Sequence, residues 1–190
     1  MSAENGGMRR GGRRHQGALV AAVVAAALLT SCTTVAGAVP DCDPGPRLAV
    51  VAQSVPGASY VPCIRQRNEE WGTRSFRAGR GGSRFTLVPN RPGGRPVKVE
   101  FRSTCDVSGA VPTTPRAEGV RTSIHVATIS PRYTGTLADV FAGGCVTYRF
   151  DFARGPHIAL MEQLDTIVGL VPRRELRLEI HDQLGVDLDR

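Results

Sequence analysis

Residues 144–152 read Gly-Cys-Val-Thr-Tyr-Arg-Phe-Asp-Phe, and this stretch decides the fold of the chain. Apolar residues occupy positions 146, 148, 150 and 152, and polar residues occupy 147, 149 and 151. Successive side chains of a β-strand point to opposite faces of a sheet. The alternation therefore predicts a strand with one face in a core and the other in water.

Shorter stretches toward the N-terminus carry related patterns and predict six further strands. They are apolar runs, alternating in the later ones, bounded by Pro, Gly or polar residues: 47–53, 59–65, 71–77, 83–88, 96–102 and 120–129. Between the third and the fourth of these, residues 78–82 read Ala-Gly-Arg-Gly-Gly. A glycine-rich turn of this kind suits a β-hairpin.

The last 38 residues change character and predict helices. Gly155-Pro156 can open a helix, and apolar residues then recur every three to four positions from Leu160 to Val171, where Pro172 ends the pattern. Residues 173–184 fit either a strand, through alternation, or a helix closed by Gly185, and we favour the helix. Strands first and helices last predict an α+β fold. We expect an antiparallel sheet from about 47–152, with one or two C-terminal helices packed on it.

The N-terminus is typical of a signal peptide. A cationic head of four arginines precedes the uncharged run 17–29, which is too short for the roughly 20 residues that a spanning helix needs. Leu29-Thr30-Ser31-Cys32 follows and resembles the lipobox of bacterial lipoproteins. The resemblance covers this segment only. It implies cleavage before Cys32, a diacylglyceryl group on its sulfur, and a protein anchored on the extracytoplasmic face of the cell membrane.

The alternative is an ordinary secreted protein that is cut elsewhere, for which Ala36-Gly37-Ala38 is a possible site. On the lipoprotein interpretation, residues 1–31 are the signal peptide, 32–46 form a tether poor in large apolar residues, and 47–190 form a single domain.

Four cysteines remain once Cys32 carries lipid, an even number that predicts two disulfides in an oxidising compartment. Three pairings are possible. We favour Cys42–Cys63 and Cys105–Cys145, because these pairs close the smaller loops and flank predicted strands. A zinc site is the rival interpretation, but no two cysteines lie within four residues of each other.

Motifs for catalysis are not evident in the sequence. No Gly-x-Ser-x-Gly, P-loop or Cys-x-x-Cys motif occurs, so we expect no catalytic residues, no metal and no cofactor. His125, His157 and His181 have no spacing typical of metal ligands, and each is interpreted as a structural or surface residue.

Positive charge concentrates in residues 65–102, which hold ten basic and three acidic residues. Arg74, Arg77, Arg80 and Arg84 alternate there with Trp71, Phe76 and Phe85. On a hairpin these four arginines could meet anionic lipid headgroups, anionic wall polymers or an envelope protein. The extracytoplasmic compartment argues against nucleic acid. The alternative is that the arginines are merely solvated charges while the aromatic residues pack the core.

The sequence therefore predicts a membrane-anchored, non-enzymatic binding domain at the cell envelope. The alternatives are an envelope hydrolase, with a site assembled from distant residues and one of the histidines, or a carrier of lipids or small ligands in an apolar cavity.

Overall fold

The computed structural model describes residues 34–65, 71–90, 95–152 and 157–189, and only the backbone of 157–161. Cys32 and the predicted signal peptide lie outside the described residues. The described residues belong to one compact unit.

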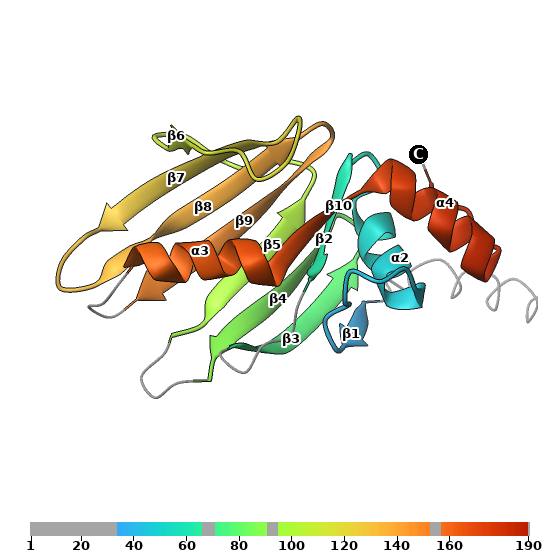
Figure 1. Cartoon of the computed structure of the whole chain (residues 1–190), viewed down its shortest axis with the longest axis horizontal. Helices are drawn as coiled ribbons and strands as arrows, with labels where there is room; N and C mark the ends of the chain where they lie inside the picture. Colours follow the sequence, from blue (N-terminus) through green and yellow to red (C-terminus); the bar gives the residue numbers. More distant parts are fainter. Residues whose placement is uncertain (1–33, 66–70, 91–94, 153–156, 190) are drawn as a thin grey trace, which may run out of the picture. The chain divides into compact units, whose positions relative to one another are not determined.

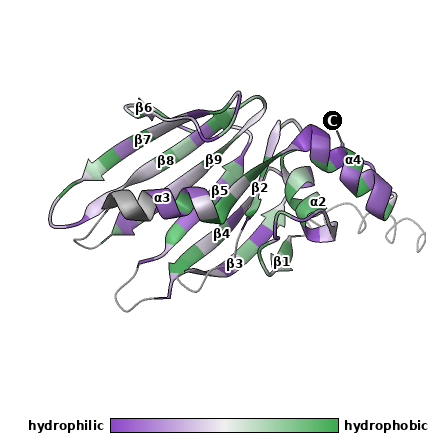
Figure 2. Cartoon of the chain, in the orientation of Figure 1, coloured by the Kyte–Doolittle hydropathy of each residue, from purple (hydrophilic) through white to green (hydrophobic). Residues whose placement is uncertain are grey.

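Eight strands form one sheet in the order β1-β3-β4-β5-β9-β8-β7-β6, in which every neighbouring pair is antiparallel. Their bounds are β1 Val35–Gly37, β3 Trp71–Gly79, β4 Gly82–Pro89, β5 Val97–Arg102, β6 Val111–Thr113, β7 Arg121–Thr128, β8 Tyr133–Phe141 and β9 Gly144–Phe152. The predicted α+β fold with an antiparallel sheet is confirmed. Hydrophobic and hydrophilic positions alternate along these strands (Figure 2).

Helices and a small second sheet lie against one face of the large sheet (Figure 1). They are α2 (Pro46–Ser54), α3 (His157–Ile167) and the antiparallel pair β2 (Tyr60–Ile64) with β10 (Val168–Pro172). The helix α4 (Arg173–Leu184) packs on α2 and β10. Fully buried side chains from both layers form the core, among them Leu48, Leu87, Val99, Phe101, Val146, Tyr148, Leu164 and Leu176.

Both predicted disulfides are confirmed, with Cα–Cα distances of 4.9 Å for Cys42–Cys63 and 6.1 Å for Cys105–Cys145. Gly169 on β10 packs directly on the first of them. A Cβ at this position would lie 2.7 Å from Sγ of Cys42, so only glycine fits beside the bridge without a shift.

The prediction of a strand at 47–53 is wrong, because this stretch lies in α2. Leu48, Val51, Ala52 and Val55 are buried, and their spacing of three and four residues is that of one helical face. Pro46 occupies the first turn, where a missing N–H is tolerated. A short apolar run fits both the period of a helix and the period of a strand, and the tertiary contacts decide which of the two forms.

The predicted helix up to Pro172 is correct only as far as Ile167, because Val168–Pro172 form β10. This strand pairs with β2 from Val168↔Ile64 to Pro172↔Tyr60. Its β-branched valines suit a strand. The helix favoured at 173–184 is confirmed: Leu176 and Ile180 are buried on α4, and Gly185 closes it in the left-handed conformation with φ 63°.

Most of the segment predicted as a tether belongs to the folded unit. Val35–Gly37 form the edge strand β1 on β3, Val39 is buried, and Cys42 is cross-linked to β2. β8 was not predicted, because its inward positions include Gly135 and Asp139, which interrupt the apolar alternation.

Candidate anion-binding face

Polar side chains line up across the strands on the face of the large sheet opposite to the helices. In an antiparallel sheet, residues in register stand side by side, so each row runs perpendicular to the strands. One row contains Arg77, Arg84, Glu100 and Thr147 on β3, β4, β5 and β9. The next, here called the cationic row, contains Arg74, Thr86, Lys98, Arg149, Thr136 and His125 on β3, β4, β5, β9, β8 and β7.

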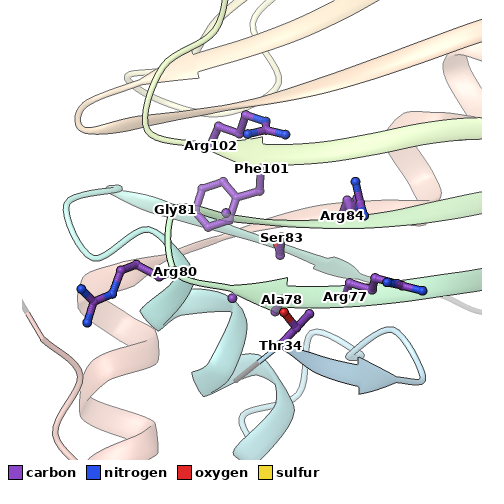
Figure 3. A pocket seen from close by; sticks show the side chains of 11 residues that line it. Thr34, Arg77, Ala78, Arg80, Gly81, Ser83, Arg84, Phe101 and Arg102 are labelled. Carbon is purple, nitrogen blue, oxygen red and sulfur yellow. The ribbon is translucent and has the colours of Figure 1, made fainter. Parts of the chain in front are cut away.

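The predicted arginines do not form one group. Arg74, Arg77 and Arg84 are exposed on this face, with Arg77 directly opposite Arg84. Arg80 lies in the turn between β3 and β4, and its side chain points away from the other arginines (Figure 3). The interleaved aromatic residues pack inward, with Trp71, Phe76 and Phe85 at most 5 % exposed, as the alternative interpretation expected for them.

A hollow of about 370 Å³ lies at the turn end of the hairpin (Figure 3). Four cationic residues line it and are here called the hairpin-end cluster: Arg77, Arg80, Arg84 and Arg102. Thr34 lines the same hollow. This follows from the pairing of Val35 with Ala78, which brings the chain into β1 from the hairpin end.

The cations of this face are largely unpaired. Within the part of the chain that the structure describes, Arg102 bonds Glu100 at 3.3 Å, whereas Arg74, Arg77, Arg80, Arg84, Lys98 and Arg149 form no ion pair. Like charges directly opposite each other on a sheet are destabilising. Arg77 lies directly opposite Arg84, and Arg84 lies opposite Glu100 on its other side, so the like charges of this row are only partly offset.

A polar groove of about 450 Å³ lies over the other end of the cationic row. Its floor includes Arg149, Thr136 and His125, and the loop 104–110 forms its wall. The disulfide Cys105–Cys145 fixes this loop to β9. Hydrogen bonds from Ser108 hold the pKa of Asp106, at the rim, below its usual value.

The histidines give partial support to the hydrolase alternative. His125 shares the groove with Asp106 and Glu100. Its Nδ1 lies 3.3 Å from the carbonyl of Gly109, and among the described residues no hydrogen bond joins it to a carboxylate or hydroxyl. His181 is exposed and contacts Asp187 at 3.0 Å. His157 begins α3, and its side chain lies outside the described residues.

An apolar groove of about 860 Å³ lies on the other side of the hairpin turn. It runs between α2 and the segment that follows α4, and Val35, Leu184 and Val186 line it with 38–47 % of their surface exposed. This is the feature that the carrier alternative requires, although it lies beside α2 and not between the sheet and the helices.

Sequence reasoning missed a buried charged cluster centred on Arg116. Its Nη1 donates to Asp139 at 2.8 Å and to Tyr148 at 2.6 Å, and its Nη2 donates to the carbonyl of Val168 at 2.6 Å. Asp165 contacts its Nε at 2.5 Å. The cluster joins the loop before β7 to the sheet, α3 and β10. In the sequence Arg116 is a single arginine in a predicted loop, and no pattern there predicts this structural role.

Burial governs the electrostatics of this cluster. Burial alone would lower the pKa of Arg116, but Tyr148, Asp139 and Asp165 raise it above its usual value, so the guanidinium stays charged. Burial also raises the pKa of Tyr148 well above its usual value, and the neighbouring Asp139 raises it further. The cluster is held together by the charged guanidinium of Arg116, which donates to Asp139 and to the neutral phenol of Tyr148.

Comparison of the chain with protein-family models, curated proteins and solved structures finds no match. Among the described residues, no helix is long and apolar enough to cross a membrane, and no group of three or more metal-binding side chains comes together.

Proposed function

We propose that the protein is an extracytoplasmic lipoprotein, anchored through lipid on Cys32, whose folded unit is a non-enzymatic binding domain that rests on the anionic membrane surface. One observation carries the proposal: Thr34, two residues after Cys32, lines the same hollow as the hairpin-end cluster. In the sequence the lipobox and the arginines of the hairpin-end cluster are far apart. In the fold, the chain that follows the lipobox lies beside these arginines, which supports a common role at the membrane.

Distance supports this orientation. Two residues span at most about 7 Å. Charges are screened over about 8 Å at physiological ionic strength. A lipid on Cys32 therefore keeps Thr34, and the arginines around it, within reach of the headgroups. Each cation near an anionic leaflet contributes about 1 kcal/mol, so the three that form no ion pair among the described residues, Arg77, Arg80 and Arg84, contribute on the order of 3 kcal/mol.

Lipidation is tested on the mature protein by mass spectrometry of its N-terminus. We expect the chain to begin at Cys32 with a diacylglyceryl group, and Cys32→Ala to abolish both processing before residue 32 and membrane retention. A mature chain that begins after residue 36 and carries no lipid would instead indicate an ordinary secreted protein.

Membrane contact is tested with the unit 33–190, exported behind a signal peptide without a lipobox. This unit contains both disulfides and the described core. We expect it to sediment with vesicles rich in phosphatidylglycerol and not with phosphatidylcholine vesicles, and 0.5 M salt should release it. The double variant Arg80→Gln/Arg84→Gln should bind about 30-fold more weakly, as the loss of about 2 kcal/mol implies.

The matched control is Arg95→Gln/Arg132→Gln. It removes the same charge from the opposite end of the sheet, where both arginines contact Asp151. Equal losses in the two double variants would show that only net charge matters, and would contradict a specific contact by the hairpin end.

The apolar groove favours a second candidate function, that of a lipid or small-ligand carrier. Its exposed lining of Val35, Leu184 and Val186 is the specific observation. Native mass spectrometry of the exported unit tests it. A co-purified lipid that is lost in Val186→Asp would support a carrier, and a ligand-free protein would leave the groove as part of the membrane-facing surface.

A further inference from the structure

We propose that the cationic row binds a linear polymer of phosphate esters, laid across the strands of the open sheet face with one end in the polar groove. The inference deepens the proposed binding role by naming a partner class. It does not rest on lipidation of Cys32 or on membrane contact, because the row lies apart from Arg77 and Arg84, two residues along β4 and three residues, across a β-bulge, along β3.

The register of the sheet gives the row its length and straightness. Its six positions lie on six successive strands, from Arg74 on β3 to His125 on β7. Five strand spacings of about 4.8 Å make a track about 24 Å long. Its three permanent cations are Arg74, Lys98 and Arg149, and Thr86 and Thr136 place hydroxyl donors between and beside them. Such a track matches a polymer with regularly repeated negative charges better than a single small anion.

The charges along the track are available. Arg74, Lys98 and Arg149 are exposed and form no ion pair with another described residue. The two carboxylates near the groove are already engaged: Glu100 contacts Arg102 at 3.3 Å, and Asp106 accepts the amide of Ser108 at 2.9 Å. Their repulsion of an incoming anion is therefore reduced, but not removed.

The chemistry favours phosphate esters over the other linear polyanions. Single-stranded nucleic acid is held by aromatic side chains on which bases stack. The two rows named above contain no Phe, Tyr or Trp, since Phe85, Phe101 and Tyr148 on the same strands point into the core, and His125 is their single aromatic ring. Carboxylates are planar and gain most from paired, bidentate guanidinium contacts. The row instead places one ammonium, two guanidinium groups and two hydroxyls along a single line. Such a set of separate donors suits phosphates, which have charged oxygens on several sides.

The groove gives the track an end. Arg149, Thr136 and His125 line the groove from the sheet, and residues of the loop 104–110 line it from one side. Because Cys105–Cys145 fixes this loop to β9, the groove does not depend on the ligand for its shape. A chain lying along the row therefore passes from open surface at Arg74 into the polar groove at His125.

The experiment measures binding of the exported unit 33–190 to synthetic poly(glycerol phosphate) by fluorescence anisotropy, without vesicles. We expect log Kd to change linearly with log salt concentration, with a slope of about 2 to 3 for three contacts. Lys98→Gln/Arg149→Gln should weaken binding about tenfold. It should also lower the salt slope by the share of two ionic contacts, about 1.5 to 2. Asp106→Asn, which removes a negative charge from the rim, should tighten binding about twofold.

The control pair is Arg174→Gln/Arg177→Gln on α4, which lies away from the open face and carries the same change in charge. Equal losses in both pairs would overturn the proposal. Equal affinity for polyglutamate would overturn the choice of phosphate, and equal affinity for single-stranded DNA would overturn the exclusion of nucleic acid. If the unsubstituted unit binds phosphatidylglycerol vesicles but not poly(glycerol phosphate), the proposal for the cationic row is refuted. The proposed membrane contact then still stands.

Discussion

Replacing Arg116 with Met is expected to lower the free energy of unfolding by about 3–5 kcal/mol, the cost of leaving one member of a buried ion pair uncompensated. Asp139 has no solvent-exposed surface, and Arg116 is its only cationic contact among the described residues. In the variant Asp139 keeps the hydrogen bond from Thr122, at 2.8 Å, but loses its counter-ion. The carbonyl of Val168 loses a donor as well.

Two further variants separate the buried charge from lost packing. Asp165 is 56 % exposed at its side chain, so Asp165→Asn should cost less than about 1 kcal/mol, although it contacts the same guanidinium. Arg116→Met/Asp139→Leu removes both buried charges and should be more stable than Arg116→Met alone. Urea unfolding of the exported unit at pH 7, with disulfides intact, measures all four proteins.

The reasoning is refuted if Arg116→Met lies within about 1 kcal/mol of the wild type, or if Arg116→Met/Asp139→Leu is no more stable than Arg116→Met. Either result would mean that water or relaxation solvates Asp139. The cluster would then not be what holds the loop before β7 on the sheet.

Two more predictions concern stability. Because the pKa of Tyr148 is raised in the folded protein, the unfolded chain alone releases this proton above about pH 10, and stability should fall there by up to about 1.4 kcal/mol per pH unit. Urea unfolding at increasing pH should show a smaller fall in Tyr148→Phe, and parallel curves would contradict the shift. Gly143→Ala places a Cβ against the carbonyl oxygen of Gly57 at φ 70°, whereas Gly119→Ala has the same φ and open space. Thermal unfolding should show Gly143→Ala to be the less stable by about 1–3 kcal/mol, and equal stabilities would exclude the clash.

The sequence predicts an element well where one face is apolar and the other is not. β9 has the predicted bounds of residues 144–152, because every inward position from Val146 to Phe152 is apolar. β8 escaped prediction because Asp139 faces inward. An acid in the core is stable only because Arg116, from another part of the chain, meets it there. The pattern of residues along β8 gives no sign of this contact, because Arg116 reaches Asp139 only in the folded protein.

The candidate site was predictable in the same partial way. Residues 65–102 stood out by charge, and three of the four named arginines, Arg74, Arg77 and Arg84, lie on the open face. Arg149 follows Arg84 by 65 residues in the sequence and joins this face only because β9 pairs with β5. Its polar position on a predicted strand indicated an outward side chain. Which residues lie beside Arg149 in the sheet depends on the order of the strands, and the alternation of apolar and polar residues does not specify that order.

The cross-link between Cys42 and Cys63 has a mechanical consequence for a chain held at Cys32. Tension on the anchor acts first on the three-residue edge strand β1, which can peel from β3 with few hydrogen bonds lost. From Cys32 to Cys42 the chain has ten residues, which reach at most about 35 Å when drawn straight. Beyond that length the load passes through the disulfide to β2, and the strands of the large sheet other than β1 are bypassed. With the proposed anchor at Cys32, the protein therefore has a short extensible segment that ends at a covalent cross-link, and peeling of β1 separates Thr34 from the hairpin-end cluster.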